Sequence, residues 1–318
     1  MKKTVVGIDI GGTNIDLGFV DANGNILYRL HHATKEYPEF SDLVKGLHDE
    51  VKEIIEKKDY ELVAIGIGAP NGNYYNGTIE YAPNLTWEGI VPAVKMFTDV
   101  FGIPVYITND ANAATIGEML FGGAKGMDDF IYITLGTGVG SGIVVNGQVV
   151  YGHDGFAGEI GHTIVEEGGR LCGCGRHGCL ETYSSVSGLL RSVKMHIDEY
   201  PDSILNRYDK DKITGKDVYN AALDGDELAL KAFDIAAKKL GLGLANAVAI
   251  TSPRAIFLFG GLAKAKEFIF GATKEYMEER LLNVFRNKID FKPSMLAGNE
   301  AAIKGAAALA WNEVLNNE

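Results

Sequence analysis

The chain has 318 residues, of which 46% are hydrophobic, and it carries a formal net charge of −12 at pH 7. This length exceeds the usual size of one domain and predicts two domains, with ample apolar residues for their cores. The acidic balance argues against a nucleic-acid-binding surface, and it provides no basic patch to hold a membrane. The first apolar run, Val5 to Ile8, is too short for a signal peptide, and no run is long enough to span a bilayer. We therefore expect a soluble, cytoplasmic protein.

The first predicted strand, Val5 to Ile10, ends in the glycine turn Gly11-Gly12-Thr13, and a second strand runs through Leu17 to Val20. Such a turn exposes backbone N–H groups and one hydroxyl, which suit phosphate oxygens. Asp9, at the end of the first strand, is placed to hold Mg²⁺ directly or through water. Glycine turns beside an aspartate are common, so this segment alone is equally compatible with a plain hairpin.

A helix over Phe40 to Lys58 and a strand over Leu62 to Ile67 follow, and the strand leads into a loop that contains Gly72. After a further strand, Ile103 to Thr108, the residues Asn109 and Asp110 precede a helix-forming stretch through Leu120. This order places a carboxylate at a helix N-terminus. Taken alone, Asp110 favours an N-cap.

The pattern of the first glycine turn occurs again between Phe130 and Gly152. A strand leads to a glycine turn with a threonine, then to a strand, an Asn-Gly turn and another strand. Gly12-Thr13 aligns with Gly136-Thr137, and Asn23-Gly24 aligns with Asn146-Gly147 after a one-residue slip. Two copies predict two similar domains facing each other across a cleft, each contributing a phosphate-binding turn. With a phosphate site inferred, a general base becomes the better interpretation of Asp110.

All three cysteines, Cys172, Cys174 and Cys179, lie close together, and His162 shortly precedes them. They supply four ligands of the type that tetrahedral zinc prefers. An odd number of cysteines makes a disulfide framework the poorer interpretation. His177 competes with His162 as fourth ligand, although the short loop between Cys174 and Cys179 makes convergence harder. Four protein ligands leave no open position, so we expect a structural metal.

Two acidic residues, Glu159 and Glu181, flank the cysteine-rich segment. The metal does not need them, which leaves them free to face a substrate. The metal would then hold the wall of a binding site together.

The rest of the chain is predicted to alternate helices with one strand. The expected helices are Val186 to His196, Asp217 to Leu223, Asp226 to Ile250 with a slight break at Gly241 and Gly243, and Glu300 to Leu315. The expected strand is Ala255 to Phe259, and Gly260-Gly261 follows it into another helix.

These motifs resemble those of the ROK family (repressors, open reading frames and sugar kinases), within the actin-like ATPase and hexokinase superfamily. The resemblance extends from Asp9 to about Gly305. The segments that carry it are Asp9 to Thr13, Asn109 to Ala113, Leu135 to Gly140, Gly158 to His162, and Cys172 to Glu181. The last two segments together are highly specific to this family.

The resemblance implies an α/β fold with two actin-like ATPase (ribonuclease H-like) domains flanking a cleft. The first domain would comprise residues 1–115 and be completed by the C-terminal helix, residues 300–318. The second would comprise residues 116–299 and contain the zinc-binding insertion. A homodimer is expected from the family alone.

The resemblance also assigns roles to individual residues. Asp110 would be the catalytic base that takes the proton from a sugar hydroxyl. The residues expected to bind the other sugar hydroxyls are Gly72, Asn84, Asn109, Glu159, His162 and Glu181. His162 would serve sugar and zinc from its two ring nitrogens. The residues expected at the nucleotide and its phosphates are Asp9, Gly11, Gly12, Thr13, Gly136, Thr137, Gly138, Gly260 and Gly261; for the last two, simple packing at a helix start is the alternative.

The implied reaction is in-line transfer of a phosphoryl group from ATP·Mg²⁺ to a hexose, most simply a glucokinase reaction forming glucose 6-phosphate. Other hexoses remain open, namely N-acetylmannosamine, N-acetylglucosamine, fructose, mannose and allose, because a few loop residues near 71–76 and Asn84 could decide the contact with the 2-position. A non-catalytic sugar-sensing member of the family is the less favoured alternative. The DNA-binding members carry a helix-turn-helix domain before the kinase-like body, and we expect no room for one before Gly11.

Overall fold

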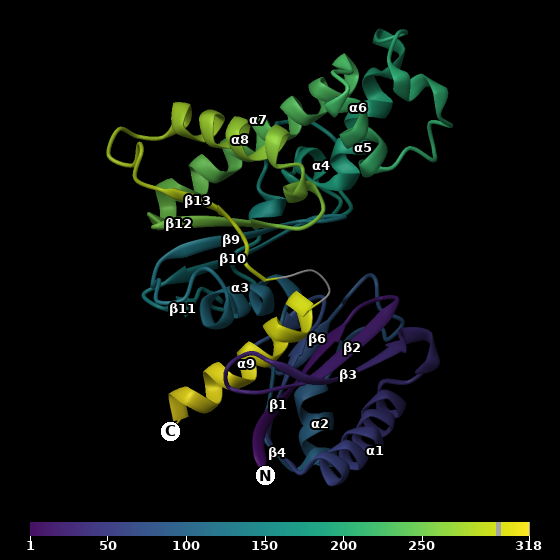
Figure 1. Cartoon of the computed structure of the whole chain (residues 1–318), viewed down its shortest axis with the longest axis vertical. Helices are drawn as coiled ribbons and strands as arrows, with labels where there is room; N and C mark the ends of the chain where they lie inside the picture. Colours follow the sequence, from purple (N-terminus) through teal and green to yellow (C-terminus); the bar gives the residue numbers. More distant parts are fainter. Residues whose placement is uncertain (297–299, 318) are drawn as a thin grey trace. The chain divides into compact units, whose positions relative to one another are not determined.

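The computed structural model describes residues 1–296 and 300–317, and these form two compact units (Figure 1). The first unit comprises Met1–Met127, Gln148–Gly158 and the described part of Ser294–Glu318. The second comprises Asp128–Gly147 and Glu159–Pro293. Each unit is an α/β structure with its own helices and its own mixed sheet. The first unit contains all five strands of its sheet, and the second contains four of the five strands of the other sheet.

The sheet of the first unit has the strand order β3-β2-β1-β4-β8. Its strands are β1 (Lys2–Ile10), β2 (Asn14–Val20), β3 (Ile26–Ala33), β4 (Tyr60–Gly68) and β8 (Val105–Thr108). The first three form an antiparallel meander, whereas β1, β4 and β8 run parallel. The buried strands β1 and β4 are nearly continuous apolar runs, as expected where both faces of a sheet are covered.

Helices cover both faces of this sheet. One face packs with α1 (Phe40–Lys58) and α2 (Ala93–Phe101), and the other with α9 (Ala301–Asn317). α9 approaches closely because Gly7 and Gly66 lack side chains: a Cβ on Gly7 would lie 2.3 Å from the backbone oxygen of Ile303. α3 (Asp110–Phe121) packs against α9, and a small sheet of β5 (Gly72–Asn73), β6 (Thr78–Glu80) and β7 (Ile90–Val91) completes the unit.

The second unit repeats the central topology of the first. β9 (Phe130–Leu135) and β10 (Val139–Val145) form an antiparallel hairpin, and β12 (Ala255–Phe259) and β13 (Asp290–Pro293) extend it in parallel. The order β10-β9-β12-β13 therefore matches β2-β1-β4-β8. β11 (Gln148–Val149) follows β10 after a turn at Asn146 and Gly147, both at positive φ, as the sequence predicts. The two glycine-turn hairpins are thus confirmed as equivalent elements.

The helices of the second unit pack into one large apolar core. They are α4 (Glu181–Ser184), α5 (Val186–His196), α6 (Gly215–Leu223), α7 (Glu227–Thr251) and α8 (Lys266–Arg280). Short 3-10 turns occur in the two units at Thr34–Glu36, Ile160–His162, Ile197–Glu199, Ile204–Arg207 and Leu262–Lys264.

The predicted break in the long helix at Gly241 and Gly243 is wrong, because α7 is continuous through both. The glycines serve close packing instead. A Cβ on Gly241 would lie 2.7 Å from Cβ of Tyr276 on α8, and one on Gly243 would lie 2.8 Å from Cδ2 of Leu180.

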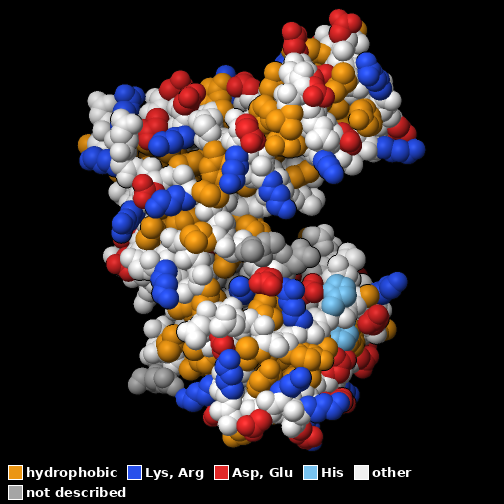
Figure 2. All heavy atoms as spheres, viewed as in Figure 1, with side chains coloured by type: hydrophobic (Ala, Val, Ile, Leu, Met, Phe, Trp, Pro, Cys, Tyr) orange, Lys and Arg blue, Asp and Glu red, His pale blue; other side chains and the backbone are white. Residues whose placement is uncertain are grey.

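On the visible face in Figure 2, lysine and arginine side chains are interspersed with aspartate and glutamate. No helix among the described residues is long and apolar enough to cross a membrane.

Candidate active site

The first glycine turn connects β1 to β2. It is held by a backbone hydrogen bond of its own and by one from Thr34, the first residue of the 3-10 turn after β3. The N–H of Gly11 donates to the oxygen of Asn14 (2.9 Å), and the Thr34 hydroxyl donates to the oxygen of Gly11 (2.7 Å). Gly12 and Thr13 remain exposed. The turn therefore offers a preformed backbone surface of the kind that phosphate groups bind.

Asp9 lies beside this turn in an acidic environment. It is paired with Asp16 across the β1–β2 ladder and with Gly68 on β4. Burial, followed by the charges of Asp110 and Asp16, raises the pKa of Asp9 to about 7. A buried carboxylate group beside other carboxylates is of the type that a divalent cation stabilises.

Asp110 begins α3, but it is not the cap of that helix. The cap is Asn109, whose side-chain oxygen accepts a hydrogen bond of 2.7 Å from the N–H of Asn112. Asp110 accepts a hydrogen bond from the adjacent N–H of Ala111 (2.9 Å) and is accessible to solvent. Desolvation by the surrounding protein raises its pKa against the opposing effect of the backbone N–H groups. These properties leave Asp110 available as a proton acceptor.

Two loops of the first unit bring further predicted residues towards this end of the sheet. Gly12 packs against the loop that carries Asn84, because a Cβ on Gly12 would lie 2.2 Å from the backbone oxygen of Asn84. Gly72 is buried, and a Cβ there would lie 2.4 Å from the oxygen of Thr108, just before Asn109 and Asp110. The structure thus gathers Asp9, Gly12, Gly72, Asn84 and Asp110 at neighbouring positions of one unit.

The aromatic pair that follows Gly72 does not belong to this group. The Tyr74 hydroxyl donates to Glu313 on α9 (2.8 Å), and its ring stacks on Tyr151 with centroids 4.3 Å apart. Tyr75 is more than half exposed.

The second glycine turn, in the other unit, is bordered by an acidic side chain. Within the turn, the N–H of Gly136 donates to the oxygen of Gly138 (3.0 Å). The N–H of Val139 donates to the Glu181 carboxylate (3.0 Å), and a Cβ on Gly138 would lie 2.3 Å from that same carboxylate. Glu181 thus lies directly against the turn, whereas Glu159 is exposed at the start of the 3-10 turn Ile160–His162.

The four predicted metal ligands converge in the second unit. One ligand atom each from His162, Cys172, Cys174 and Cys179 lies within 4.8 Å of the others. The Nδ1 atom of His162 faces Cys172 Sγ at 3.7 Å, and the sulfurs of Cys174 and Cys179 are 3.6 Å apart. His177 is not part of the cluster. A donor set of three thiols and one imidazole at these separations fits a tetrahedral zinc ion, held through Nδ1 of the histidine.

An apolar cavity of about 450 Å³ adjoins the second glycine turn. Its lining includes Val186, Leu189, Phe233, Gly261 and Leu262, with Lys216 and Lys264 among the remaining residues. The N–H of Val186 donates to the oxygen of Gly136 (2.9 Å), so the cavity wall is bonded to the turn. Gly260, at φ 106°, packs directly against the end of β9, because a Cβ there would lie 2.5 Å from the backbone oxygen of Leu135. An aromatic heterocycle fits a slot of this size and composition.

Sequence reasoning missed two polar residues at the site. Asp16 could have been found by counting back across the glycine turn, because residues opposite each other in the hairpin share a neighbourhood. Arg170 is only 8% exposed beside the cysteine cluster, and its role depends on contacts that the sequence does not reveal.

The fold and these sites define a class: a two-unit α/β protein with duplicated glycine-turn hairpins and a His-Cys₃ cluster. The family model that matches the chain is that of the ROK family, over residues 5–313. The chain belongs to the ROK family.

The proteins that the chain resembles include both enzymes and regulators. The chain is 35% identical over 311 residues to a glucokinase of Halalkalibacterium halodurans, covering 96% of this chain and 94% of the relative. It is 29% identical over 301 residues to the xylose repressor of Bacillus subtilis, covering 94% of this chain and 74% of the repressor. Among solved structures, a ROK family glucokinase from Streptomyces griseus in complex with glucose and AMPPNP is 34% identical, with a TM-score of 0.77 and coverage of 97% and 99%.

Proposed function

We propose that the protein is an ATP-dependent hexose kinase that converts glucose to glucose 6-phosphate. The observation that carries this proposal is Asp110: an accessible carboxylate with a raised pKa, next to a second carboxylate and a phosphate-type turn. The likeness to glucokinases over nearly the full length of both chains supports the choice of reaction and of sugar.

In this function, Asp110 accepts the proton of the attacking sugar hydroxyl. Because burial raises its pKa, the Asp110 carboxylate is more basic than an ordinary aspartate. Phosphoryl transfer needs little covalent participation from the protein, so the placement of the hydroxyl beside Asp110 supplies most of the acceleration. The side-chain oxygen of Asn109 is held by its capping hydrogen bond, and its amino group would donate to a sugar hydroxyl.

The residues proposed to bind the remaining hydroxyls of the sugar are Gly72, Asn84, Asn109, Glu159, His162 and Glu181. His162 directs Nδ1 to the cysteines, which leaves Nε2 for a hydroxyl. A zinc ion in the cluster would be structural, since all four of its positions are taken by protein. It would hold the His162 loop and the Glu181 helix together.

ATP would be bound by both glycine turns and by the apolar cavity. The adenine ring would occupy the slot between α5, α7 and the Gly260-Gly261 loop, and Gly136, Thr137 and Gly138 would contact phosphates beside it. Gly11, Gly12 and Thr13 would contact the transferred group. Asp9 would hold the Mg²⁺ that accompanies the nucleotide. The charge of this ion would also offset the negative charges of Asp110 and Asp16, which contribute to the raised pKa of Asp9.

A sugar-binding regulator without kinase activity is a second candidate, because the xylose repressor of Bacillus subtilis is similar over 94% of this chain. The raised pKa of Asp110 and the open phosphate turns favour the enzyme, since a sensor has no need of either.

The decisive experiment is to measure ADP release from ATP·Mg²⁺ over a panel of hexoses, with the zinc content of the protein determined in parallel. Turnover with glucose well above all other sugars supports the proposal. Turnover with an N-acetylated hexose or fructose instead retains the mechanism and replaces the substrate. Sugar binding without any ADP release rejects the kinase and supports the regulator.

A further inference from the structure

A buried arginine joins the cysteine loop to the helices that follow it. Arg170 lies two residues before Cys172, and its guanidinium donates to the backbone oxygens of Thr182 (2.8 Å) and Gly188 (3.1 Å). A third hydrogen bond goes to the hydroxyl of Ser192 (2.9 Å). A single side chain thus bonds to both α4 and α5.

The same arginine is fixed to the loop that surrounds it. Its guanidinium lies 4.4 Å from the centre of the Tyr183 ring, and its own N–H donates to the Tyr183 hydroxyl (3.0 Å). Its backbone oxygen accepts from the N–H of Gly178, one residue before Cys179. Arg170 therefore holds the cysteine loop at one end and the first turn of α4 at the other.

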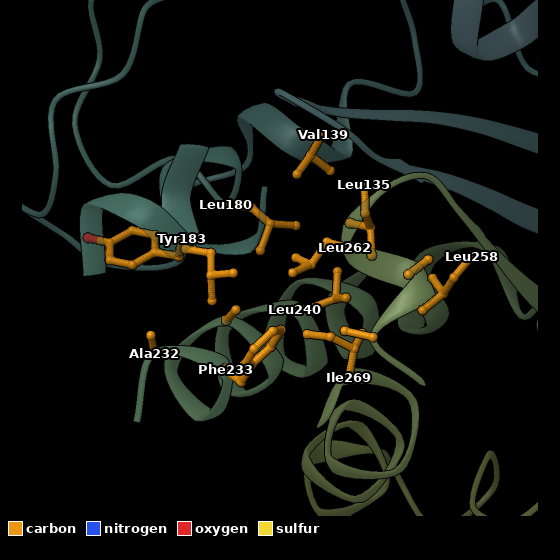
Figure 3. Close-up of a cluster of buried hydrophobic side chains, with 14 of the residues drawn as sticks. Leu135, Val139, Leu180, Tyr183, Ala232, Phe233, Leu240, Leu258, Leu262 and Ile269 are labelled. Atoms are coloured by element: carbon orange, nitrogen blue, oxygen red, sulfur yellow. The ribbon is translucent and has the colours of Figure 1, made fainter. Parts of the chain in front are cut away.

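Glu181 begins α4, one residue before Thr182, so its position depends on this arrangement. Figure 3 shows Leu180 and Tyr183 entering the same apolar cluster as Leu135 and Val139, with the Tyr183 hydroxyl directed away from it. The apolar side of α4 is thus held by packing, and the polar side by Arg170. A four-residue helix has few backbone hydrogen bonds of its own, so its orientation depends on outside contacts such as these. The Ser184 hydroxyl supplies another by donating to the backbone oxygen of Ala236 (2.8 Å).

We propose that Arg170 is a positioning residue, which fixes both the metal cluster and the Glu181 carboxylate for sugar binding. The inference rests on the proposed function for the role of Glu181, but its effect on the metal cluster is independent of that function. Removal of the guanidinium takes this donor from the buried carbonyl oxygen of Thr182 on α4, whereas the oxygen of Gly188 still accepts from the Ser192 hydroxyl (3.1 Å). We therefore expect α4 to shift so that the Thr182 oxygen gains another donor. Outer residues that orient ligands typically alter metal affinity or activity by about tenfold or more when they are changed.

The test compares Arg170→Met with Lys239→Met in the zinc-loaded protein. Lys239 is the matched control: its ammonium also lies over the Tyr183 ring (5.1 Å), but its other partner is Glu166 on the loop surface. Two rates are measured, namely zinc transfer to a chromogenic chelator and ADP release as a function of glucose and of ATP concentration.

We expect Arg170→Met to accelerate zinc transfer about tenfold and to raise the KM for glucose by a similar factor, with the KM for ATP within about twofold of the unchanged protein. Lys239→Met should leave all three values nearly unchanged. Equal zinc transfer in Arg170→Met and in the unchanged protein overturns the proposal, as does an equal effect of Lys239→Met. A lower melting temperature with both KM values unchanged also overturns it, because the residue would then be merely structural.

Two further variants serve if Arg170→Met does not fold. Arg170→Lys retains the charge but not the planar set of donors, and Ser192→Ala removes only one of its partners. Each should give a smaller change in the same direction, about two- to threefold, and no change in either overturns the proposal. If the unchanged protein shows no ADP release at all, the proposed kinase fails, while zinc transfer still decides the role of Arg170.

Discussion

The N–H of Val139 and the carboxylate of Glu181 are joined by a hydrogen bond of 3.0 Å. Val139 is the first residue after the second glycine turn, and the other carboxylate oxygen of Glu181 lies 3.7 Å from Cys172 Sγ. One acidic side chain therefore contacts both the turn assigned to phosphate and the cluster assigned to zinc. Disturbance of the cluster is expected to reach the proposed sugar site through this residue.

Zinc removal should therefore impair sugar binding before it unfolds the protein. Treatment with a chelator should lower the affinity for glucose about tenfold or more, because His162 and Glu181 lose their fixed positions. Calorimetric titration with glucose before and after chelation measures the effect, and re-addition of zinc should restore the affinity. Glucose affinity that is indifferent to the metal would show that the cluster has no part in the sugar site.

Replacement of the proposed base should separate chemistry from binding. Asp110→Ala should reduce kcat by about 10² to 10⁴-fold, the usual contribution of a general base, while glucose binding remains measurable. Asp99→Ala provides the control, because Asp99 is an exposed residue on α2 of the same unit and forms an ion pair with Lys95. Near-normal turnover in Asp110→Ala would falsify the assignment.

The raised pKa of Asp9 predicts a pH dependence of stability. Its pKa is about 7 in the folded chain and near 3.8 when unfolded, so the folded state binds the proton more tightly. The contribution of Asp9 is therefore fully favourable below about pH 4 and is lost as the pH rises through 7. Urea unfolding between pH 5 and 8 should show this decline in the unchanged protein and a flatter profile in Asp9→Asn. Asp16→Asn should move the decline to lower pH, because the charge of Asp16 contributes to the shift; identical profiles in all three proteins would contradict this prediction.

Two glycines of the cysteine loop should respond differently to alanine. Gly178 has φ +80° and a Cβ there would lie 1.7 Å from the oxygen of Glu166, whereas Gly175 has φ +84° and open space around it. Gly175→Ala should cost only the backbone strain, about 1–2 kcal/mol. Gly178→Ala adds a clash with backbone and should cost more than about 3 kcal/mol in the free energy of unfolding. Denaturant titration of both variants measures the difference, and equal losses would mean that the close contact at Gly178 has no energetic weight.

The apolar cavity should be adjustable through Gly261. A Cβ there would lie 3.5 Å from Val186 Cγ2, an ordinary contact, so Gly261→Val should fold and narrow the slot. We expect the KM for ATP to rise about tenfold and the affinity for glucose to stay constant, since one bulky group in a ring-binding slot removes much of its contact area. Gly271→Val on α8 lies in open space and controls for the added side chain. An unaltered KM for ATP would place the base of the nucleotide elsewhere.

The sequence predicted the strongly patterned elements well. The bounds of α1, α5 and β12 agree with the predicted ones, because local patterns mark them. These are the amphipathic spacing of the two helices, the Ser185 cap of α5 and the continuous apolar run of β12. It did not predict α2, which is short and follows a proline, nor β13, whose residues Asp290–Pro293 lack an apolar pattern. These elements form because neighbouring parts of the unit complete their hydrogen bonds and cover their apolar side chains, which no local window reveals.

The same distinction applies to the site. Cysteine spacing located the metal cluster, since ligands close in sequence converge through short turns. The interactions of Glu181 with Val139 and of Arg170 with α4 and α5 join segments brought together by folding, and arginine is a residue type that is rarely buried. These interactions depend on tertiary structure, so the sequence alone did not predict them.

The close packing of α9 on Gly7 and Gly66 affects the order in which the two units fold during synthesis. During synthesis, β1 and β4 emerge early, but the helix that covers one of their faces is translated after the whole second unit. The second unit can therefore fold while the first still exposes the apolar residues Val5 and Ala64 to solvent. In a nascent chain arrested before residue 301, the second unit should therefore be folded while the first still exposes apolar surface. We expect holdase chaperones to bind at this stage of translation.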